Sequence, residues 1–174
     1  GLMRNTRYET LSEHCLDVAV IAHALCVIGN KRLGKSYDSN KIALLGVFHD
    51  AGEIITGDMP TPIKYANNEL KQAYKSVEKS AAQTLLEKLP EDLKEDYAYL
   101  FLEEHIDNEE KIILKAADKI SALIKCQEEE NSGNKEFIKA KEATLQSINK
   151  MDCKEANIFL EEFFQGFTKT LDEL

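Results

Sequence analysis

The sequence predicts an all-α fold, a helical bundle of roughly six or seven helices. Apolar residues recur at steps of three and four along most of the 174 residues, which is the spacing of one face of an α-helix. No run of four to eight residues alternates between apolar and polar, so strands have little support. Three prolines, eight glycines and the lack of a low-complexity run exclude a disordered or collagen-like chain. The length fits a single domain, residues 1–174.

The first two helices are predicted from their apolar faces and their end signals. The segment 11–29 carries a buried stripe made of His14, Val18, Ile21, Leu25 and Ile28. Gly29 and Asn30 are expected to end this helix. A second helix is expected from about Ser39, because Asp38, Ser39 and Asn40 offer N-cap oxygens, and it runs into His49-Asp50.

The rest of the chain divides at prolines, glycines and polar clusters. Residues 56–62 contain two prolines and one glycine and are expected to form an ordered loop facing a substrate. A long helix should follow and end at Pro90, with a face formed by Leu70, Tyr74, Val77, Ala81, Leu85 and Leu89. Further helices are predicted over 92–105, 108–130, 135–151 and 154–171.

Charge and composition exclude several classes of partner. The chain has 22 Lys+Arg against 31 Asp+Glu, a net charge of -9, which makes a nucleic acid a poor partner. The longest nearly apolar run, 18–28, is too short to span a bilayer, so no membrane partner is expected. The first residues lack the apolar core of a signal peptide, and the four cysteines form no C-x-x-C pair. A cytoplasmic protein with reduced, mostly buried thiols is therefore expected.

The adjacent pair His49-Asp50 is the first candidate for chemistry. It ends an apolar helix, where a carboxylate near the core needs a partner, and a metal ion is one such partner. His14 lies on the apolar face of the first helix, and Asp118 lies beside small residues in an aliphatic helix. A helix-end cap with a core histidine remains open as another interpretation of the pair.

Longer motifs around these residues are more specific. They are Ser12-Glu13-His14, the run from Ile42 into His49-Asp50-Ala51-Gly52-Glu53, Thr56-Gly57-Asp58-Met59-Pro60-Thr61-Pro62, and Lys115-Ala116-Ala117-Asp118. The order His, His-Asp, Asp resembles the HD-domain superfamily of metal-dependent phosphohydrolases. The full set of motifs is similar to the YfbR-like 5'-deoxynucleotidases over essentially the whole chain.

The resemblance implies a single HD domain over residues 1–174 that removes the 5'-phosphate from deoxyribonucleoside 5'-monophosphates. It also implies one divalent metal ion per subunit, held by His14, His49, Asp50 and Asp118. Co, Mn, Zn, Fe and Mg all remain open as the metal. The family's Arg-Trp pair, just upstream of the stretch that matches residues 2–5, has no counterpart in this chain, which starts at Gly1.

The same resemblance assigns roles to the remaining polar residues. Glu53 would be the catalytic carboxylate, and Asp58 and Thr61 would contact the substrate. Glu53 is four residues from His49 and shares its face if helical geometry continues through Gly52. It could serve as base or as acid. Without the resemblance, Glu53 is interpreted as a solvated acid at a helix end, and Asp58 as a side chain that caps the backbone of its own turn.

Basic residues near the motifs are candidates for binding a phosphate. They are Arg4, Arg7 and Lys64, each of which could instead be an ordinary surface charge. An aromatic band of Phe159, Phe163, Phe164 and Phe167 is mostly core, and part of it is expected at a homodimer interface, because the family is often dimeric.

Two further hypotheses about function stay open. The chain could hydrolyse another nucleotide, such as a triphosphate, an alarmone or a cyclic nucleotide. It could also be a catalytically silent HD domain that binds a nucleotide or a protein partner. Glu53 favours an enzyme, because a pure binding domain has no need of it.

Overall fold

The computed structural model describes residues 4–64 and 66–173, and it confirms the all-α class. No strand occurs among these residues, and seven of their helices have eight residues or more. The chain divides into two compact units, one of residues 48–107 and one of residues 4–47 and 108–173. A single domain over the whole chain stays a prediction.

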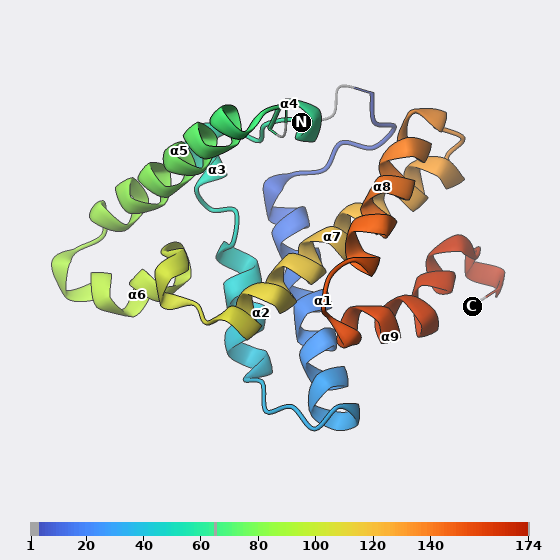
Figure 1. The fold of residues 1–174 in the computed structure, drawn as a ribbon, viewed down its shortest axis with the longest axis horizontal. Coiled ribbons are helices and arrows are strands. Elements are labelled where there is room, and N and C mark those ends of the chain that lie inside the picture. Colours follow the sequence, from blue (N-terminus) through green and yellow to red (C-terminus); the bar gives the residue numbers. More distant parts are fainter. Residues whose placement is uncertain (1–3, 65, 174) are drawn as a thin grey trace. The chain divides into compact units, whose positions relative to one another are not determined.

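The larger unit is built on two long helices, α1 (Leu11–Arg32) and α7 (Asn108–Asn131). α7 contacts α1 and also α8 (Ile138–Asn149), while α9 (Lys154–Glu162) contacts α1 (Figure 1). The buried side chains at the centre include Val18, Leu25, Ile113, Ile120 and Leu123. The apolar stripe expected for α1 and the aliphatic residues of α7 therefore form this core.

α1 begins where the sequence predicts and ends later. Thr10 caps it, because the Thr10 hydroxyl accepts from the Glu13 backbone N–H and the Glu13 carboxylate accepts from the Thr10 backbone N–H. The helix continues through Gly29 to Arg32, so the predicted end was wrong. Gly29 serves packing, since a Cβ there would lie 2.6 Å from the ring of Tyr37.

α2 (Ser39–Phe48) starts at the predicted N-cap and crosses close to α1. The Asp38 carboxylate accepts from the backbone N–H groups of Asn40 and Lys41. A Cβ at Gly46 would stand 2.8 Å from the Ala19 Cα, so only glycine permits this approach of the two backbones. This contact packs α2 against α1 within the larger unit.

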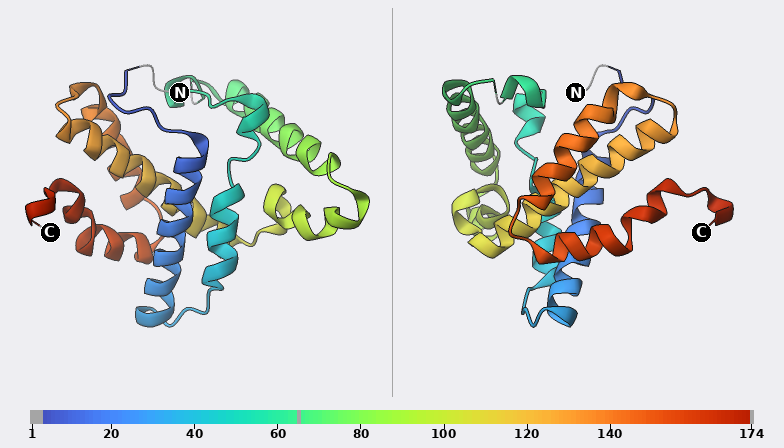
Figure 2. Two further views of the ribbon diagram at one scale, coloured as in Figure 1. Left: turned by 180° about the vertical axis from the view of Figure 1, so that it is seen from behind. Right: turned by 45° about the vertical axis from the view of Figure 1, so that its right-hand side comes forward.

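The smaller unit contains α3 (Glu53–Thr56), α4 (Thr61–Lys64), α5 (Asn68–Glu87) and α6 (Lys94–Phe101). α5 contacts α3, α4 and α6, and Figure 2 shows α5 and α6 joined by a turn. α5 ends before Pro90 as predicted. Its predicted apolar face was wrong at Val77, which is exposed. Leu86, which was not assigned to that face, is buried.

Three of the later helices are shorter than predicted. The segment 92–105 contains only α6, flanked by single 3-10 turns at Glu91–Leu93 and Glu103–His105. α8 follows a 3-10 turn at Lys135–Phe137, and α9 stops at Glu162, followed by 3-10 turns at Phe164–Thr168 and Leu171–Glu173. A 3-10 turn repeats every three residues, which is close to the spacing of an α-helix. Apolar periodicity alone therefore could not show where each α-helix changes into a 3-10 turn.

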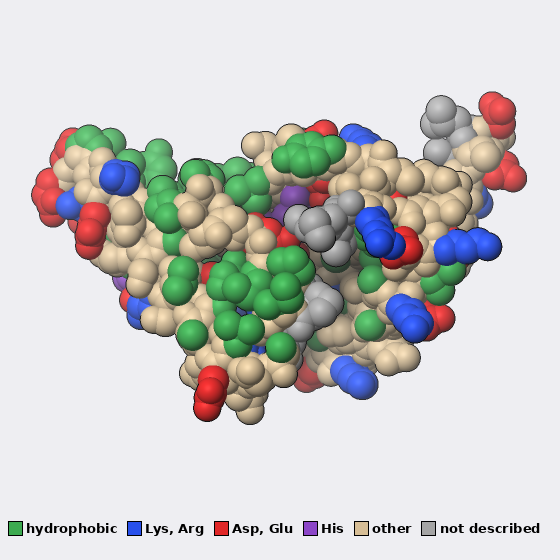
Figure 3. Space-filling model, turned by 90° about the horizontal axis from the view of Figure 1, so that it is seen from above, with side chains coloured by type: hydrophobic (Ala, Val, Ile, Leu, Met, Phe, Trp, Pro, Cys, Tyr) green, Lys and Arg blue, Asp and Glu red, His purple; other side chains and the backbone are tan. Residues whose placement is uncertain are grey.

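The aromatic band and the cysteines divide between core and surface. Phe159 is buried, whereas Phe163 and Phe167 are exposed, and exposed apolar side chains also occur on the face drawn in Figure 3. All four cysteines are buried free thiols, as expected. Burial raises the pKa of Cys26 to about 12 and that of Cys153 to about 11, which makes both thiols unreactive.

The apolar run 18–28 was expected to be too short to span a bilayer. The whole of α1 is nevertheless long and apolar enough to cross a membrane, by length and composition alone. Its 22 residues reach a mean hydropathy of 1.6 in the most apolar window, and 44% of that window is buried inside the protein. Core helices of soluble proteins meet the same criteria. The buried side chains of α1 face α7 and α9, which is the arrangement of a core helix.

Candidate active site

His14 and Asp118 form one polar pair, in the larger unit. His14 projects from the first turns of α1, and Asp118 projects from the middle of α7, which packs on α1. The His14 Nε2 lies 3.4 Å from an Asp118 carboxylate oxygen. The His14 side chain is mostly buried, with 19% exposed, while Asp118 is about half exposed. Two residues far apart in the sequence therefore meet.

Ser121 holds the other ring nitrogen of His14. Its hydroxyl oxygen lies 3.4 Å from His14 Nδ1, one helical turn after Asp118 on α7. Ser121 is buried, and its only signal in the sequence is its small size. A proton on Nδ1 would donate to Ser121 and leave the Nε2 lone pair available, which is the tautomer that a metal-binding histidine needs.

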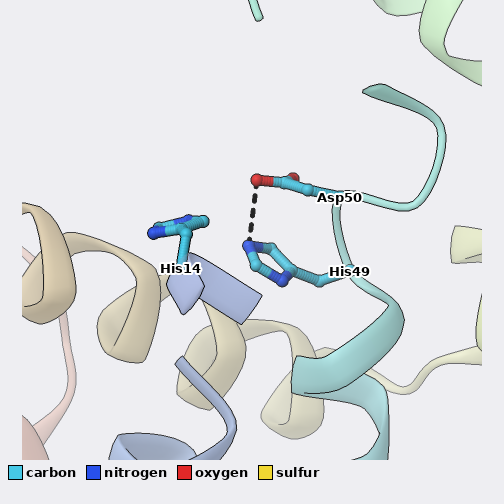
Figure 4. A group of neighbouring side chains, drawn as sticks. All are labelled: His14, His49 and Asp50. Carbon is cyan, nitrogen blue, oxygen red and sulfur yellow. Dashed lines mark ion pairs between the residues drawn. The ribbon is translucent and has the colours of Figure 1, made fainter. Parts of the chain in front are cut away.

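His49 and Asp50 form a second polar pair, at the end of α2. His49 Nε2 lies 3.1 Å from the Asp50 carboxylate, and both side chains are less than one third exposed (Figure 4). Phe48, the last residue of α2, packs edge-on against Tyr97 and Phe101 of α6. This aromatic cluster anchors the backbone immediately before His49, so the pair stands on a fixed support.

The four residues 49–52 form turns and not a helix. The Ala51 N–H donates to the Phe48 carbonyl and the Glu53 N–H to the Asp50 carbonyl, so these bonds span three residues instead of four. The condition under which His49 and Glu53 would share a helical face is therefore not met. Glu53 opens the short helix α3 and is partly buried.

A tight turn after α3 presents Asp58. Gly57 has a positive φ of 65°, a conformation that side chains disfavour, and it ends α3. Its carbonyl accepts from the Thr56 hydroxyl and from the hydroxyl of the buried Tyr74 on α5. Asp58 is exposed directly after this fixed point. The predicted loop 56–62 is thus shorter, because Thr56 belongs to α3 and α4 begins at Thr61.

The other predicted substrate contacts are distributed over both units. Lys64 ends α4 and pairs with Glu78 at 2.7 Å. Arg4 pairs with Glu136, and Arg7 pairs with Glu13, both at the surface. The side chain of Thr61 lies outside the described residues.

Comparison with known proteins places these residues in a family. The family model described as 5'-deoxynucleotidase YfbR-like matches residues 1–167. The chain belongs to the YfbR-like 5'-deoxynucleotidase family. It is 45% identical to a 5'-deoxynucleotidase of Photobacterium profundum, over 99% of this chain and 89% of that one. It is 44% identical to a 5'-deoxynucleotidase of Pectobacterium atrosepticum, over 99% and 87%.

A solved structure supports the fold of this YfbR-like chain. An HD-domain phosphohydrolase from Listeria innocua superposes with a TM-score of 0.83 over 94% of this chain and 79% of its own, at 24% identity. This likeness shows the HD-domain fold expected from the sequence.

The donor set of the YfbR-like chain fits a divalent metal ion. His14, His49 and Asp50 qualify as candidate ligands, and Asp118 lies beside His14. Neutral imidazole and carboxylate are both good ligands for divalent first-row metals. Two neutral histidines and two carboxylates balance the charge of a 2+ ion, and their buried or half-buried positions favour such neutralisation.

Glu129, a buried carboxylate on α7 of this YfbR-like chain, was not predicted from the sequence. Only 1% of Glu129 is exposed. It accepts from the Thr6 backbone N–H and hydroxyl, from the Arg7 N–H and from the Asn134 amide, at 2.7–3.3 Å. Burial raises the pKa of Glu129, but these donors outweigh burial and hold the pKa below its ordinary value. Glu129 thereby anchors the segment before α1.

Removing this charge should weaken the fold in a pH-dependent way. A lowered pKa in the folded state stabilises the protein above the ordinary carboxyl pKa, and this stabilisation is lost as the pH falls through the folded value. Glu129→Gln should therefore lower the free energy of unfolding at pH 7 by about 1.5–3 kcal/mol, the worth of hydrogen bonds to a charge. The difference in the free energy of unfolding between the variant and wild type should become smaller below about pH 4.3, the ordinary Glu pKa.

Urea unfolding at pH 7 and at acid pH measures this effect. Glu128→Gln is the matched control, because Glu128 is the exposed neighbour on the same helix, and it should change stability little. A Glu129→Gln protein as stable as the control at pH 7 would contradict the anchoring role.

Proposed function

We propose that this chain removes the 5'-phosphate from deoxyribonucleoside 5'-monophosphates and yields a deoxynucleoside and phosphate. The observation that carries the proposal is the pairing of His14 with Asp118 and of His49 with Asp50 in a member of the YfbR-like 5'-deoxynucleotidase family. The relatives named above are called 5'-deoxynucleotidases, and they match nearly the whole chain.

In this proposal, His14, His49, Asp50 and Asp118 hold one divalent ion, whether Co, Mn, Zn, Fe or Mg. When bound, such an ion polarises a phosphoryl oxygen and lowers the pKa of a water. Both histidines must be neutral to bind the ion, so the ligand set should lose the metal at acid pH. When the ion is bound, the Ser121 hydroxyl could accept from His14 Nδ1–H and so help to orient the ring.

Glu53 is the proposed catalytic residue. A carboxylate can accept a proton from the attacking water or, once protonated, donate one to the 5'-oxygen that leaves. Glu53 begins α3, three residues after Asp50, and the Asp50 carbonyl accepts from its backbone N–H at 2.9 Å. This backbone hydrogen bond supports the proposal, because it joins Glu53 to the turn that carries Asp50.

Recognition of the substrate is assigned to both ends of the turn after α3 and to the basic residues. Asp58 would accept a hydrogen bond from the sugar 3'-hydroxyl, with Thr61 as a neighbouring donor. Arg4, Arg7 and Lys64 are proposed to neutralise the phosphate. Each of these cations pairs with a glutamate in the structure, so binding would exchange a glutamate for the phosphate.

A substrate panel tests the proposal. Phosphate release is measured from deoxy- and ribonucleoside 5'-monophosphates, from a nucleoside triphosphate and from a cyclic nucleotide. The proposal predicts release that is largely confined to the deoxynucleoside monophosphates. Release from another nucleotide alone would favour a different HD phosphohydrolase, and silence on the whole panel with intact nucleotide binding would favour the silent binding domain.

We also propose that the chain works as a homodimer through the exposed face of α1. Leu16, Val20 and Val27 are 59%, 62% and 39% exposed, and His23 lies between them on the same side of the helix. On a helical wheel these residues, together with Glu13 and Lys31, fall within an arc of about 80°.

A second copy fits this face because the face is complementary to itself. An antiparallel α1 from a second copy, related by a two-fold axis, would place Leu16 beside Val27 and Glu13 near Lys31. Apolar contacts would then form the centre, with opposite charges at both ends. Part of the aromatic band was expected at the interface, and Phe163 and Phe167 of that band are exposed as well.

The oligomeric state should respond to α1 and not to the C-terminal aromatic residues. Val20→Glu places a charge at the centre of the proposed interface and should convert a dimer into a monomer in light scattering. Phe163→Ser, at another exposed apolar side chain, is the control and should leave the dimer intact. A wild-type monomer at about 50–100 µM, roughly a hundred times a Kd near 1 µM, would contradict the proposal.

The cytoplasm is the proposed compartment of this enzyme. All four cysteines are free and buried, which is the state that a reducing compartment maintains.

A further inference from the structure

We infer that Tyr74 of α5 is a positioning residue for the substrate, because its hydroxyl tethers the turn that presents Asp58. This inference rests on the proposed function and adds to it a residue outside every motif that identified the family. Tyr74 is buried, with 7% exposed, and its hydroxyl donates to the Gly57 carbonyl at 2.9 Å. Asp58 is the next residue along the chain.

One face of α5 contacts the catalytic segment on both sides of α3. Before α3, the Gly52 backbone approaches α5, where a Cβ at Gly52 would lie 3.6 Å from the Glu78 carbonyl and 3.8 Å from the Ala81 side chain. After α3, Tyr74 holds Gly57. Tyr74, Glu78 and Ala81 follow the spacing of a single helical face. Glu53 and Asp58 are thus bracketed by contacts with one rigid helix.

Lys64 closes the same segment against α5. Its ammonium pairs with Glu78 at 2.7 Å and lies 4.9 Å from the centre of the Tyr74 ring. The ring of Tyr74 therefore supports α4 while its hydroxyl supports the turn. Since the Tyr74 hydroxyl crosses from one element to another, it fixes the turn more strongly than the Thr56 hydroxyl, which binds only its neighbour Gly57.

The tether should matter for sugar binding more than for the chemical step. Gly57 has a positive φ, and its carbonyl accepts from two hydroxyl donors that help to set the turn. Removing the Tyr74 hydroxyl frees the backbone before Asp58. It does not alter Glu53 or any of the four proposed ligands. The expected result is a weaker substrate complex with a similar turnover rate.

The experiment compares Tyr74→Phe with wild type and with Tyr99→Phe, a half-buried tyrosine on α6. Tyr74→Phe should raise KM for a deoxynucleoside monophosphate by about five- to tenfold, the effect of one lost hydrogen bond, with kcat within about twofold of wild type. Tyr99→Phe should leave KM unchanged. In hydrogen exchange of the metal-free protein, Tyr74→Phe should speed exchange of the amides in 57–64, including those of Gly57 and Ile63.

The two measurements separate failure of this inference from failure of the proposed function. Unchanged exchange in 57–64 would overturn the tether whatever the enzyme hydrolyses. Faster exchange with an unchanged KM would overturn the positioning role. If wild type hydrolyses no deoxynucleotide, the proposed function fails and the positioning role falls with it, while the exchange result still decides whether the tether exists.

Discussion

Glu53→Gln is expected to release phosphate about 100 to 10,000 times more slowly than wild type, the range that general acid-base catalysis supplies. The amide of glutamine has the size of the carboxylate but neither accepts nor delivers the proton that the reaction requires. Because Glu53 is not one of the four proposed ligands, the variant should bind the divalent ion as wild type does. The measurement is single-turnover phosphate release together with the metal content of the protein.

The matched control is Glu69→Gln, an exposed glutamate in the first turn of α5. This variant carries the same change of net charge and should keep its full rate. If Glu53→Gln retained the wild-type rate, the catalytic role assigned to Glu53 would be wrong, and Asp50 or Asp58 would have to be tested next.

Asp118→Asn should lose the metal and, with it, the activity. The substitution removes one of two proposed negative ligands and leaves His14 Nε2 beside a neutral amide. We expect at least roughly a hundredfold weaker metal affinity, since outer contacts alone contribute about 10- to 100-fold. Activity at limiting metal should fall by about a thousandfold, which corresponds to several kcal/mol of lost metal-ion catalysis.

Equilibrium dialysis against a single divalent ion measures the affinity directly. Asp92→Asn, an exposed aspartate in the 3-10 turn before α6, is the control for charge and should bind the ion normally. Circular dichroism should be unchanged in both variants, because Asp118 is about half exposed and its helix is held by other residues. Unaltered metal affinity in Asp118→Asn would require a different ligand set.

Apolar periodicity predicted where the longer helices lie. It did not predict the helix ends that depend on tertiary contacts. α1, α2 and α7 begin close to their predicted positions, because N-caps and apolar stripes are local signals. Gly29 was assigned as a helix end, yet its small size serves the contact with Tyr37, a partner that only the tertiary structure supplies. The stop at Glu162 and the turns around α6 carry no such local signal.

Within the candidate site, the motifs pointed to residues whose contacts could then be observed. His14 and Asp118 are distant in sequence, and their contact at 3.4 Å follows from the packing of α7 on α1. The metal-binding, catalytic and substrate-binding roles of the motif residues stay predictions. The hydrogen-bonded roles of Glu129, Ser121 and Tyr74 could not be found from the sequence, although Tyr74 was predicted on the apolar face of its helix. A buried hydrogen-bonded group is recognised by its partners and not by its residue type.

The measurement that tests the account most directly is phosphate release from a deoxynucleoside 5'-monophosphate before EDTA treatment, after it, and after single divalent ions are returned. The account predicts that EDTA abolishes release and that at least one of Co, Mn, Zn, Fe or Mg restores it to wild-type protein and not to Asp118→Asn at the same metal concentration. Release that persists in EDTA-treated, metal-free protein would contradict a metal-dependent centre built on His14, His49, Asp50 and Asp118.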